Sequence, residues 1–474
     1  MQEWKRKYNK SHFSLSEVKA PETAFDDQPK VLSDQTFAER KENVLQSMKR
    51  KGLDTIFIYA DREHGANFEY LTGFIPRFEE ALLAVTTEGK AKLFLGNENV
   101  KLAAYSRIHA ECVHIPHFSL PNQPMKNTKS FQAILKEEMD WNEKKVGIIG
   151  WKRFTSPFDD TSQLYDVPHF IVEAIKTLAE EQNSSIINAA EILIGEKNGV
   201  RTINNADEIH YFEFGANLAS NCVLDAMNHI EIGKTETDIA SYLSRYGQPH
   251  TVTTICATGE RFTNAVIYPR KKEIQLGDRF AITTGFKGGL TSRAGYIAKE
   301  ERDLPNEMRD YLDRAAIPYY AAITAWLENV RIGISGGEMY ELIETVLPKE
   351  EHHWELNPGH FTGDDEWLSS PMYPESTVKL KSGMMFQVDI IPSVPGYGGT
   401  SAETGIALAD EALRDKIKAD YPDLWSRFKK RREYMAKELN IHLAPEVLPL
   451  SDTVGYYRPF FLNKEKAIVA QPEK

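Results

Sequence analysis

Three side chains within residues 356–408 are of types that carry acid–base chemistry or bind metal ions: His360, Asp389 and Glu403. His360 follows Pro-Gly among turn-forming residues, Asp389 lies inside the apolar run Met-Met-Phe-Gln-Val-Asp-Ile-Ile, and Glu403 precedes another apolar run. A carboxylate buried in such surroundings is costly unless a cation or several hydrogen-bond donors accompany it. We therefore expect these side chains to meet at one site, which holds a metal ion, a cationic substrate or a structural ion pair.

The composition restricts the class of protein and its partners. At 474 residues, with 41% apolar and 11% aromatic residues, the chain is long enough for two globular domains. A net charge of −12 argues against nucleic acid or an acidic membrane as a partner. No long apolar run or signal peptide is recognisable, so we expect a soluble cytoplasmic protein. The three cysteines, at unrelated spacings, are expected to be buried thiols rather than disulfides or zinc ligands: Cys112, Cys222 and Cys256.

The first half of the chain alternates between strand-like and helix-like patterns. Residues 1–33 are polar and are expected to form an extension on the surface. Residues 34–195 then read as an α/β domain, which begins with a helix from Asp34 to Gly52 and continues with short apolar strands. An aromatic segment at residues 67–80, which contains Arg77, is expected to be a loop.

The second half has longer helices and antiparallel-looking strands. Residues 200–440 are therefore expected to form an α+β domain, and residues 441–474 a C-terminal tail. Thr235 and Asp238 resemble a capping box that opens a helix, and Gly288-Gly289 is typical of a hairpin turn between two strands. Further helices are expected at residues 206–230, from 305 onward, at 335–347 and at 410–439.

Several short motifs occur in an order that resembles the creatinase/prolidase/methionine aminopeptidase superfamily. They are Tyr70-Leu71-Thr72-Gly73-Phe74, Gly277-Asp278, Pro358-Gly359-His360, Lys381-Ser382-Gly383-Met384 and Glu403. The resemblance covers roughly residues 35–410. It implies an α/β N-terminal domain, a catalytic domain with the "pita-bread" fold, and a homodimer.

The resemblance also implies a set of metal ligands, and this sequence departs from it. In the peptidase branch, two metal ions are held by two aspartates, a histidine and two further acids, of which the last three match His360, Asp389 and Glu403. The first aspartate falls at Thr283 or Thr284, and the second at Arg293 or, in an ungapped alignment, Ala294. No carboxylate occurs between residues 279 and 299, and no histidine between residues 251 and 351. A second histidine of the family falls at Trp367.

These departures suggest that Arg293 takes the place of the metal ions. A planar guanidinium could pair with both Asp389 and Glu403, and it would repel a metal ion from the same pocket. No metal cofactor is then expected. The leading hypothesis is a metal-independent enzyme that hydrolyses a C–N bond of a small polar substrate (guanidino, amide or dipeptide-like).

In that hypothesis His360 carries the proton, while Asp389 and Glu403 act as acid and base. The expected substrate-binding residues are Arg293, Arg261, Tyr268, Trp367 and Arg77, the last of which the resemblance places near the active site of a second subunit.

Two alternatives remain open. One is a non-catalytic protein that binds a small ligand or a protein partner, with Arg293, Asp389 and Glu403 as a structural ion-pair network. The other is an Xaa-Pro-type metallopeptidase with a divalent transition metal ion at His360, Asp389 and Glu403.

Two other groups of polar residues are expected to be solvated. Asp364-Asp365-Glu366 is predicted to lie on a solvated loop, unless it attracts cations, and His352-His353 at a solvated helix end.

Overall fold

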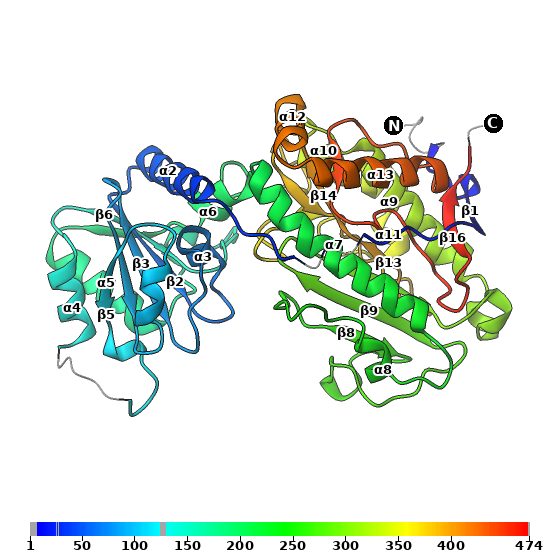
Figure 1. Ribbon diagram of the computed structural model, residues 1–474, viewed down its shortest axis with the longest axis horizontal. Helices are drawn as coiled ribbons and strands as arrows, with labels where there is room; N and C mark the ends of the chain where they lie inside the picture. The colour runs from blue at the N-terminus through cyan, green and yellow to red at the C-terminus, as the bar shows by residue number, and fades with distance from the viewer. Residues whose placement is uncertain (1–6, 25, 27, 124–128, 473–474) are drawn as a thin grey trace. The chain divides into compact units, whose positions relative to one another are not determined.

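The computed structural model describes residues 7–24, 26, 28–123 and 129–472 and divides the chain into two compact units (Figure 1). The smaller unit is residues 32–202, and the larger unit combines residues 203–474 with the first 31 residues. The predicted extension and tail thus both belong to the larger unit, where β1 (Phe13–Glu17) pairs antiparallel with β16 (Lys466–Ala470). Within the described ranges, no helix is both long and apolar enough to cross a membrane.

The smaller unit is built on a six-stranded mixed sheet with the order β5-β4-β3-β2-β6-β7. Its strands are β2 (Thr55–Ala60), β3 (Ala81–Thr86), β4 (Ala91–Leu95), β5 (Glu111–His114), β6 (Lys145–Ile149) and β7 (Ser185–Asn188). Its helices are α2 (Asp34–Lys51), α3 (Ala66–Thr72), α4 (Phe131–Glu138), α5 (His169–Glu181) and α6 (Glu191–Ile194). Short 3-10 turns are η2 (Val100–Tyr105), η3 (Pro116–Phe118), η4 (Thr161–Gln163) and η5 (Val200–Thr202).

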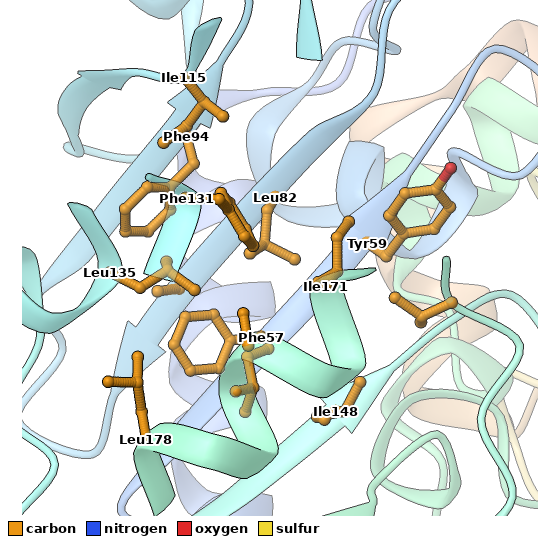
Figure 2. Close-up of a cluster of buried hydrophobic side chains, with 14 of the residues drawn as sticks. Phe57, Tyr59, Leu82, Phe94, Ile115, Phe131, Leu135, Ile148, Ile171 and Leu178 are labelled. Atoms are coloured by element: carbon orange, nitrogen blue, oxygen red, sulfur yellow. The ribbon is translucent and has the colours of Figure 1, made fainter. Parts of the chain in front are cut away.

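The core of the smaller unit lies between this sheet and the helices α4 and α5. Figure 2 shows Phe57 and Leu82 of the sheet facing Leu135 of α4 and Leu178 of α5, all of them fully buried. Sequence patterning predicted β2, β3, β4, β6, β7 and α2, which ends at Gly52 with positive φ, but not β5. The aromatic segment differs from its prediction, because its first half forms the helix α3 instead of a loop.

The larger unit contains two four-stranded antiparallel sheets, with the orders β13-β10-β9-β8 and β11-β12-β14-β15. The first has β8 (Ile255–Thr258), β9 (Arg279–Phe286), β10 (Gly289–Tyr296) and β13 (Ser401–Glu403). The second has β11 (His360–Phe361), β12 (Met385–Gln387), β14 (Gly405–Leu408) and β15 (Val447–Pro449). The α/β plus α+β fold class predicted from the sequence is confirmed.

Helices surround these sheets, and α7 packs against β9 and β10. The helices are α7 (Ala206–His229), α8 (Glu236–Ala240), α9 (Ile317–Asn329), α10 (Gly336–Val346), α11 (Lys349–His352), α12 (Glu411–Asp420) and α13 (Pro422–Glu438). Shorter turns are η1 (Lys10–His12), η6 (Thr263–Ala265), η7 (Glu301–Asp303), η8 (Asn306–Met308) and the π-helical η9 (Leu312–Ala316). The capping box at Thr235 is present, although α8 is only five residues long. The predicted tail helix is divided, because Pro422 begins a new helix.

The two sheets are joined where the chain leaves β13 and enters β14 with only Thr404 between them. Glu403 therefore lies at the junction of the sheets, and His360 lies in the second sheet. This connection brings together side chains that are far apart in the sequence.

Candidate functional site

His360 is fixed by the short strand β11, in which it lies opposite Gln387 of β12. The preceding Gly359 has φ 150°, and a Cβ atom there would lie 2.9 Å from the carbonyl oxygen of Gln387. Only glycine fits this approach, which explains the Pro-Gly-His motif. The imidazole is 1% exposed, and its Nδ1 lies 3.1 Å from the carbonyl oxygen of Phe361. Because a carbonyl can only accept, Nδ1 carries the proton when the ring is neutral, and Nε2 presents its lone pair to the site.

Two buried carboxylates approach this Nε2 from the sheet junction. Asp389 follows β12 by two residues, and its Oδ2 lies 3.8 Å from Nε2 of His360. Glu403, the last residue of β13, lies opposite Ser292 of β10. Both are less than 9% exposed. The structure thus brings together His360, Asp389 and Glu403, as the sequence predicted.

Glu366 completes the cluster, although the sequence predicted a solvated loop there. The loop closes on β11, because the amide of Phe361 donates to the carbonyl of Ser369 at 2.9 Å. This closure brings Glu366 Oε1 to 3.2 Å from Nε2 of His360. The carboxylate side chain is only 17% exposed. Nothing in the local sequence distinguishes Glu366 from its acidic neighbours, since the loop's path depends on this backbone pairing.

Ligand atoms of His360, Glu366 and Glu403 all lie within 4.8 Å of one another, as a shared metal ion would require. His360 Nε2 and Glu366 Oε1 lie 3.2 Å apart, an ion-pair distance when the ring is protonated. When the ring is neutral both atoms are acceptors, and each is buried without a hydrogen-bond donor among the described residues. Buried polar atoms are rarely left unsatisfied unless a ligand, an ion or water completes them. An imidazole nitrogen with carboxylate oxygens is a donor set that suits borderline divalent metal ions such as zinc, manganese, cobalt or iron.

The protonation of the cluster is governed by burial and by mutual repulsion of its carboxylates. Burial raises the pKa of Asp389 to about 6, an effect that the carboxylate of Glu366 reinforces and His360 partly opposes. Burial, together with the charges of Asp389 and Glu366, raises the pKa of Glu403 well above its usual value. For His360, burial favours the neutral ring, but the two nearby carboxylates outweigh it and raise the pKa. The site therefore strongly favours an additional positive charge.

Arg293 does not supply that charge, and the predicted pairing with Asp389 and Glu403 is wrong. Its guanidinium is 1% exposed and is surrounded by main-chain oxygens. It donates to the carbonyls of Ser292, Glu403, Thr453 and Tyr456 at 2.8–3.1 Å and to the hydroxyl of Thr453 at 3.0 Å.

Strand register explains this error. Arg293 lies opposite Ile282 and Ala402, whereas Ser292 lies opposite Thr283 and Glu403. Side chains alternate between the two faces of a sheet, so Arg293 and the Glu403 side chain are on opposite faces.

Two family models match separate parts of this chain. Residues 40–158 match the creatinase/prolidase N-terminal domain, and residues 212–412 match metallopeptidase family M24. The chain joins a creatinase/prolidase N-terminal domain to an M24 domain. The M24 match includes every member of the site cluster.

Several solved structures share the order and fold of these two domains. The prolidase from Pyrococcus horikoshii OT3 is 18% identical with a TM-score of 0.60, and the match covers 78% of this chain and 95% of that one. Recombinant prolidase from Thermococcus sibiricus is 17% identical with a TM-score of 0.61, and the match covers 79% of this chain and 95% of that one. A Xaa-Pro dipeptidase from Pyrococcus furiosus is 20% identical over an alignment of 305 residues, and the match covers 60% of this chain and 83% of that protein. The pita-bread fold expected from the motifs is thereby confirmed.

The face of the M24 domain that carries Glu403 has a threonine and an alanine, Thr283 and Ala294, at positions where the resemblance placed the first two aspartates. Thr283 Oγ1 donates to Ser292 Oγ at 2.8 Å, and Ala294 shares the same face. Neither β9 nor β10 contains an aspartate or glutamate. The residues present therefore fit one metal ion, at His360, Glu366 and Glu403, and provide no carboxylates for a second on these two strands.

The remaining predicted substrate-binding residues have different surroundings. Trp367 packs on His360 with ring centroids 4.1 Å apart and is 41% exposed, so it forms part of the site's wall. Arg261 lies over the ring of Phe262, and Tyr268 is 64% exposed. Arg77, in the creatinase/prolidase N-terminal domain, lies over the ring of Phe78. Substrate binding by these three residues stays a prediction.

Proposed function

We propose that the M24 domain is a hydrolase that uses one divalent transition metal ion to cleave a C–N bond of a small polar substrate. The ligands would be Nε2 of His360 and the carboxylates of Glu366 and Glu403. The main support is the pair of buried acceptor atoms that face each other at 3.2 Å when the imidazole is neutral, His360 Nε2 and Glu366 Oε1. They lie in a cluster of three carboxylates with which no lysine or arginine of the described residues forms an ion pair.

The donor set suits catalysis as well as binding. Three protein ligands leave a coordination position open, which is typical of catalytic rather than structural sites. The Phe361 carbonyl holds the proton of His360 on Nδ1, which fixes the tautomer that can bind metal through Nε2. When bound, the ion would supply a hydroxide nucleophile at neutral pH and polarise the scissile carbonyl or amidine group.

Asp389 is the group that would move the proton. Its carboxylate lies next to the ligands, 3.8 Å from Nε2 of His360, where it can reach a water molecule bound at the site. It would accept a proton from the attacking water and return it to the departing nitrogen. Trp367 would exclude solvent from one side of the imidazole and form a flat wall for the substrate.

The metal-independent mechanism expected from the sequence loses its premise. It required Arg293 to neutralise Asp389 and Glu403, and the guanidinium of Arg293 is instead saturated by main-chain oxygens. The three carboxylates and His360 then need a different cation. A divalent ion held by His360, Glu366 and Glu403 would supply that charge.

The test is turnover by protein purified without chelator and loaded with manganese, cobalt or zinc. The substrates are Xaa-Pro dipeptides, amino-acid amides and guanidino compounds, and the readout is release of the amine. We expect release by the native protein and by Glu355→Gln, an exposed control, and none by His360→Ala. Thermal shifts with members of the panel, but no release from any of them, would contradict the proposal and favour a non-catalytic binding protein.

A further inference from the structure

A second cavity of the larger unit lies away from the residues of the metal cluster. It has a volume of about 550 Å³ and is bounded by the segment around Lys10, the π-helical turn η9, the ends of α10 and α11, and Val394. None of its lining residues belongs to the cluster around His360. Its size is that of a typical small-molecule site, and π-helical turns are frequent at functional sites.

Two polar groups of this cavity are available to a ligand. Arg314, on η9, is exposed and forms no ion pair with any residue that the structure describes. Nδ1 of His352 is buried without a hydrogen-bond partner in the same part of the chain, and the His352 side chain is 12% exposed. The sequence predicted a solvated helix end here, so the burial of His352 corrects that expectation.

The other charges of the cavity are either paired or at its edge. Lys10 Nζ forms an ion pair with Asp313 at 2.8 Å, which cancels both charges. The carboxylate of Glu351 is 73% exposed and lies 4.0 Å from Nε2 of His352. Arg314 is therefore the lining cation that forms no ion pair among the described residues, and His352 is the polar group of the lining that can donate.

The rest of the lining is mixed. Pro318, Val346, Pro348 and Val394 form its apolar part, and Tyr8, Asn9 and Thr345 also line the cavity. A ligand that satisfies both parts has an anionic end for Arg314 and His352 and a compact apolar body. A guanidinium binds a carboxylate through two parallel hydrogen bonds, which favours this anion over a point charge such as chloride.

We propose that this cavity binds a small carboxylate with a branched or cyclic apolar body, through Arg314 and His352. Such a carboxylate is present in a free short-chain acid and at the C-terminus of a peptide that ends in an apolar residue. The site does not depend on the proposed hydrolase activity, because it shares no residue with the metal cluster.

The cavity is connected to the metal cluster through one loop. Residues 390–400 run from Asp389 toward Glu403, and within them Val394 lines the cavity. The neighbouring Ser393 donates its amide to the carbonyl of His352 at 3.0 Å. A bound carboxylate would therefore contact the loop that carries Asp389 at its start, and it would reduce the motion of that loop.

The experiment is calorimetric titration of the metal-free full chain with isovalerate, with the tripeptide Ala-Ala-Leu and with isovaleramide. Isovalerate and Ala-Ala-Leu, which carry a carboxylate, are each expected to bind with one molecule per chain. Isovaleramide, which lacks it, is expected not to bind. Arg314→Gln should weaken binding of the acids at least about tenfold, because it removes a charge-assisted hydrogen-bond pair. Arg309→Gln, an exposed arginine just before η9, is the matched control and should bind as the native protein does.

The same titrations distinguish the source of the carboxylate, and hydrogen exchange tests the effect on the loop. Tighter binding of isovalerate identifies a free acid as the occupant, and tighter binding of the tripeptide identifies a peptide C-terminus. Hydrogen exchange at residues 390–400 should slow when isovalerate binds the native chain and not in Arg314→Gln. The proposal is overturned if the acids do not bind saturably, if isovaleramide or acetate binds as tightly as isovalerate, or if Arg314→Gln binds unchanged.

Discussion

The guanidinium of Arg293 donates to the main-chain carbonyl of Glu403 at 3.0 Å, while the carboxylate of Glu403 lies on the opposite face of β13 with His360 and Glu366. Glu403 thus has two separate roles: its backbone carbonyl accepts a hydrogen bond from Arg293, and its side chain belongs to the candidate metal site. Arg293 also binds the carbonyls of Thr453 and Tyr456. It anchors the C-terminal segment and does not pair with the side chains of Asp389 and Glu403.

Removing Arg293 should reduce stability much more than removing an exposed arginine. In Arg293→Met, buried carbonyls lose their donors, and each unsatisfied buried group costs about 1–3 kcal/mol. We expect the free energy of unfolding of metal-free protein to fall by about 3 kcal/mol or more in urea titrations, and Arg309→Met to change it by less than about 0.5 kcal/mol. Equal effects of the two variants would contradict this role.

A carboxylate at position 293 should not create a metal ligand. The side chain there faces the carbonyls of Thr453 and Tyr456 and lies on the face opposite Glu403. Arg293→Asp is therefore expected to unfold or to lose stability without an increase in metal content, as measured by elemental analysis of the folded fraction. A gain of one metal ion per chain in a stable variant would show that residue 293 can reach the site.

Glu366 should be needed for metal binding. Loss of its carboxylate in Glu366→Gln should weaken the affinity for zinc or manganese at least about tenfold, since even indirect partners of metal ligands have effects of this size. Competition with a chromophoric chelator measures this affinity without any substrate. Glu355→Gln, an exposed glutamate five residues before His360, should bind metal as the native protein does. An unchanged affinity in Glu366→Gln would exclude Glu366 as a ligand.

Asp389 should be needed for turnover but not for metal binding. Asp389→Asn keeps the size of the side chain and removes its basicity, so the rate should fall about 10²–10⁴-fold, the range for loss of a general acid–base group. Metal affinity in the same chelator competition should remain within a few-fold of the native value. A loss of metal as large as that in Glu366→Gln would identify Asp389 as a fourth ligand instead.

The sequence predicted more of the fold than of the site. Periodicity and turn residues identified α2, the strands around Phe57 and the β9–β10 hairpin at Gly288-Gly289, because these elements depend on local chemistry. The convergence of His360, Asp389 and Glu403 was also predictable, since carboxylates in apolar runs require a partner. The orientation of the Arg293 side chain could not be predicted, because a shift of one residue in strand alignment moves a side chain to the other face of the sheet. The position of Glu366 at the site could not be predicted either, because it depends on the backbone hydrogen bond between Phe361 and Ser369 that closes the loop.

The raised pKa of Asp389 has a consequence for stability in the absence of metal. Burial raises its pKa from 3.8 to about 6, so the folded state holds this proton more tightly than the unfolded state. The resulting stabilisation is complete below about pH 4 and is lost as the pH rises through 6, at about 1.4 kcal/mol for each unit of raised pKa. Asp389→Asn lacks it. The stability of this variant relative to the native protein should therefore increase between pH 4.5 and 7.5 in urea titrations with EDTA, and a constant difference would contradict the shift.

The most direct test of the account is the number of metal ions bound per chain. Native protein purified without chelator, or stripped and reloaded, is analysed for transition metals by mass spectrometry, and its crystals are examined at the metal's absorption edge. We expect one ion per chain, contacted by Nε2 of His360 and by the carboxylates of Glu366 and Glu403. Two ions bridged by oxygen, or no stoichiometric ion under any loading condition, would contradict the account.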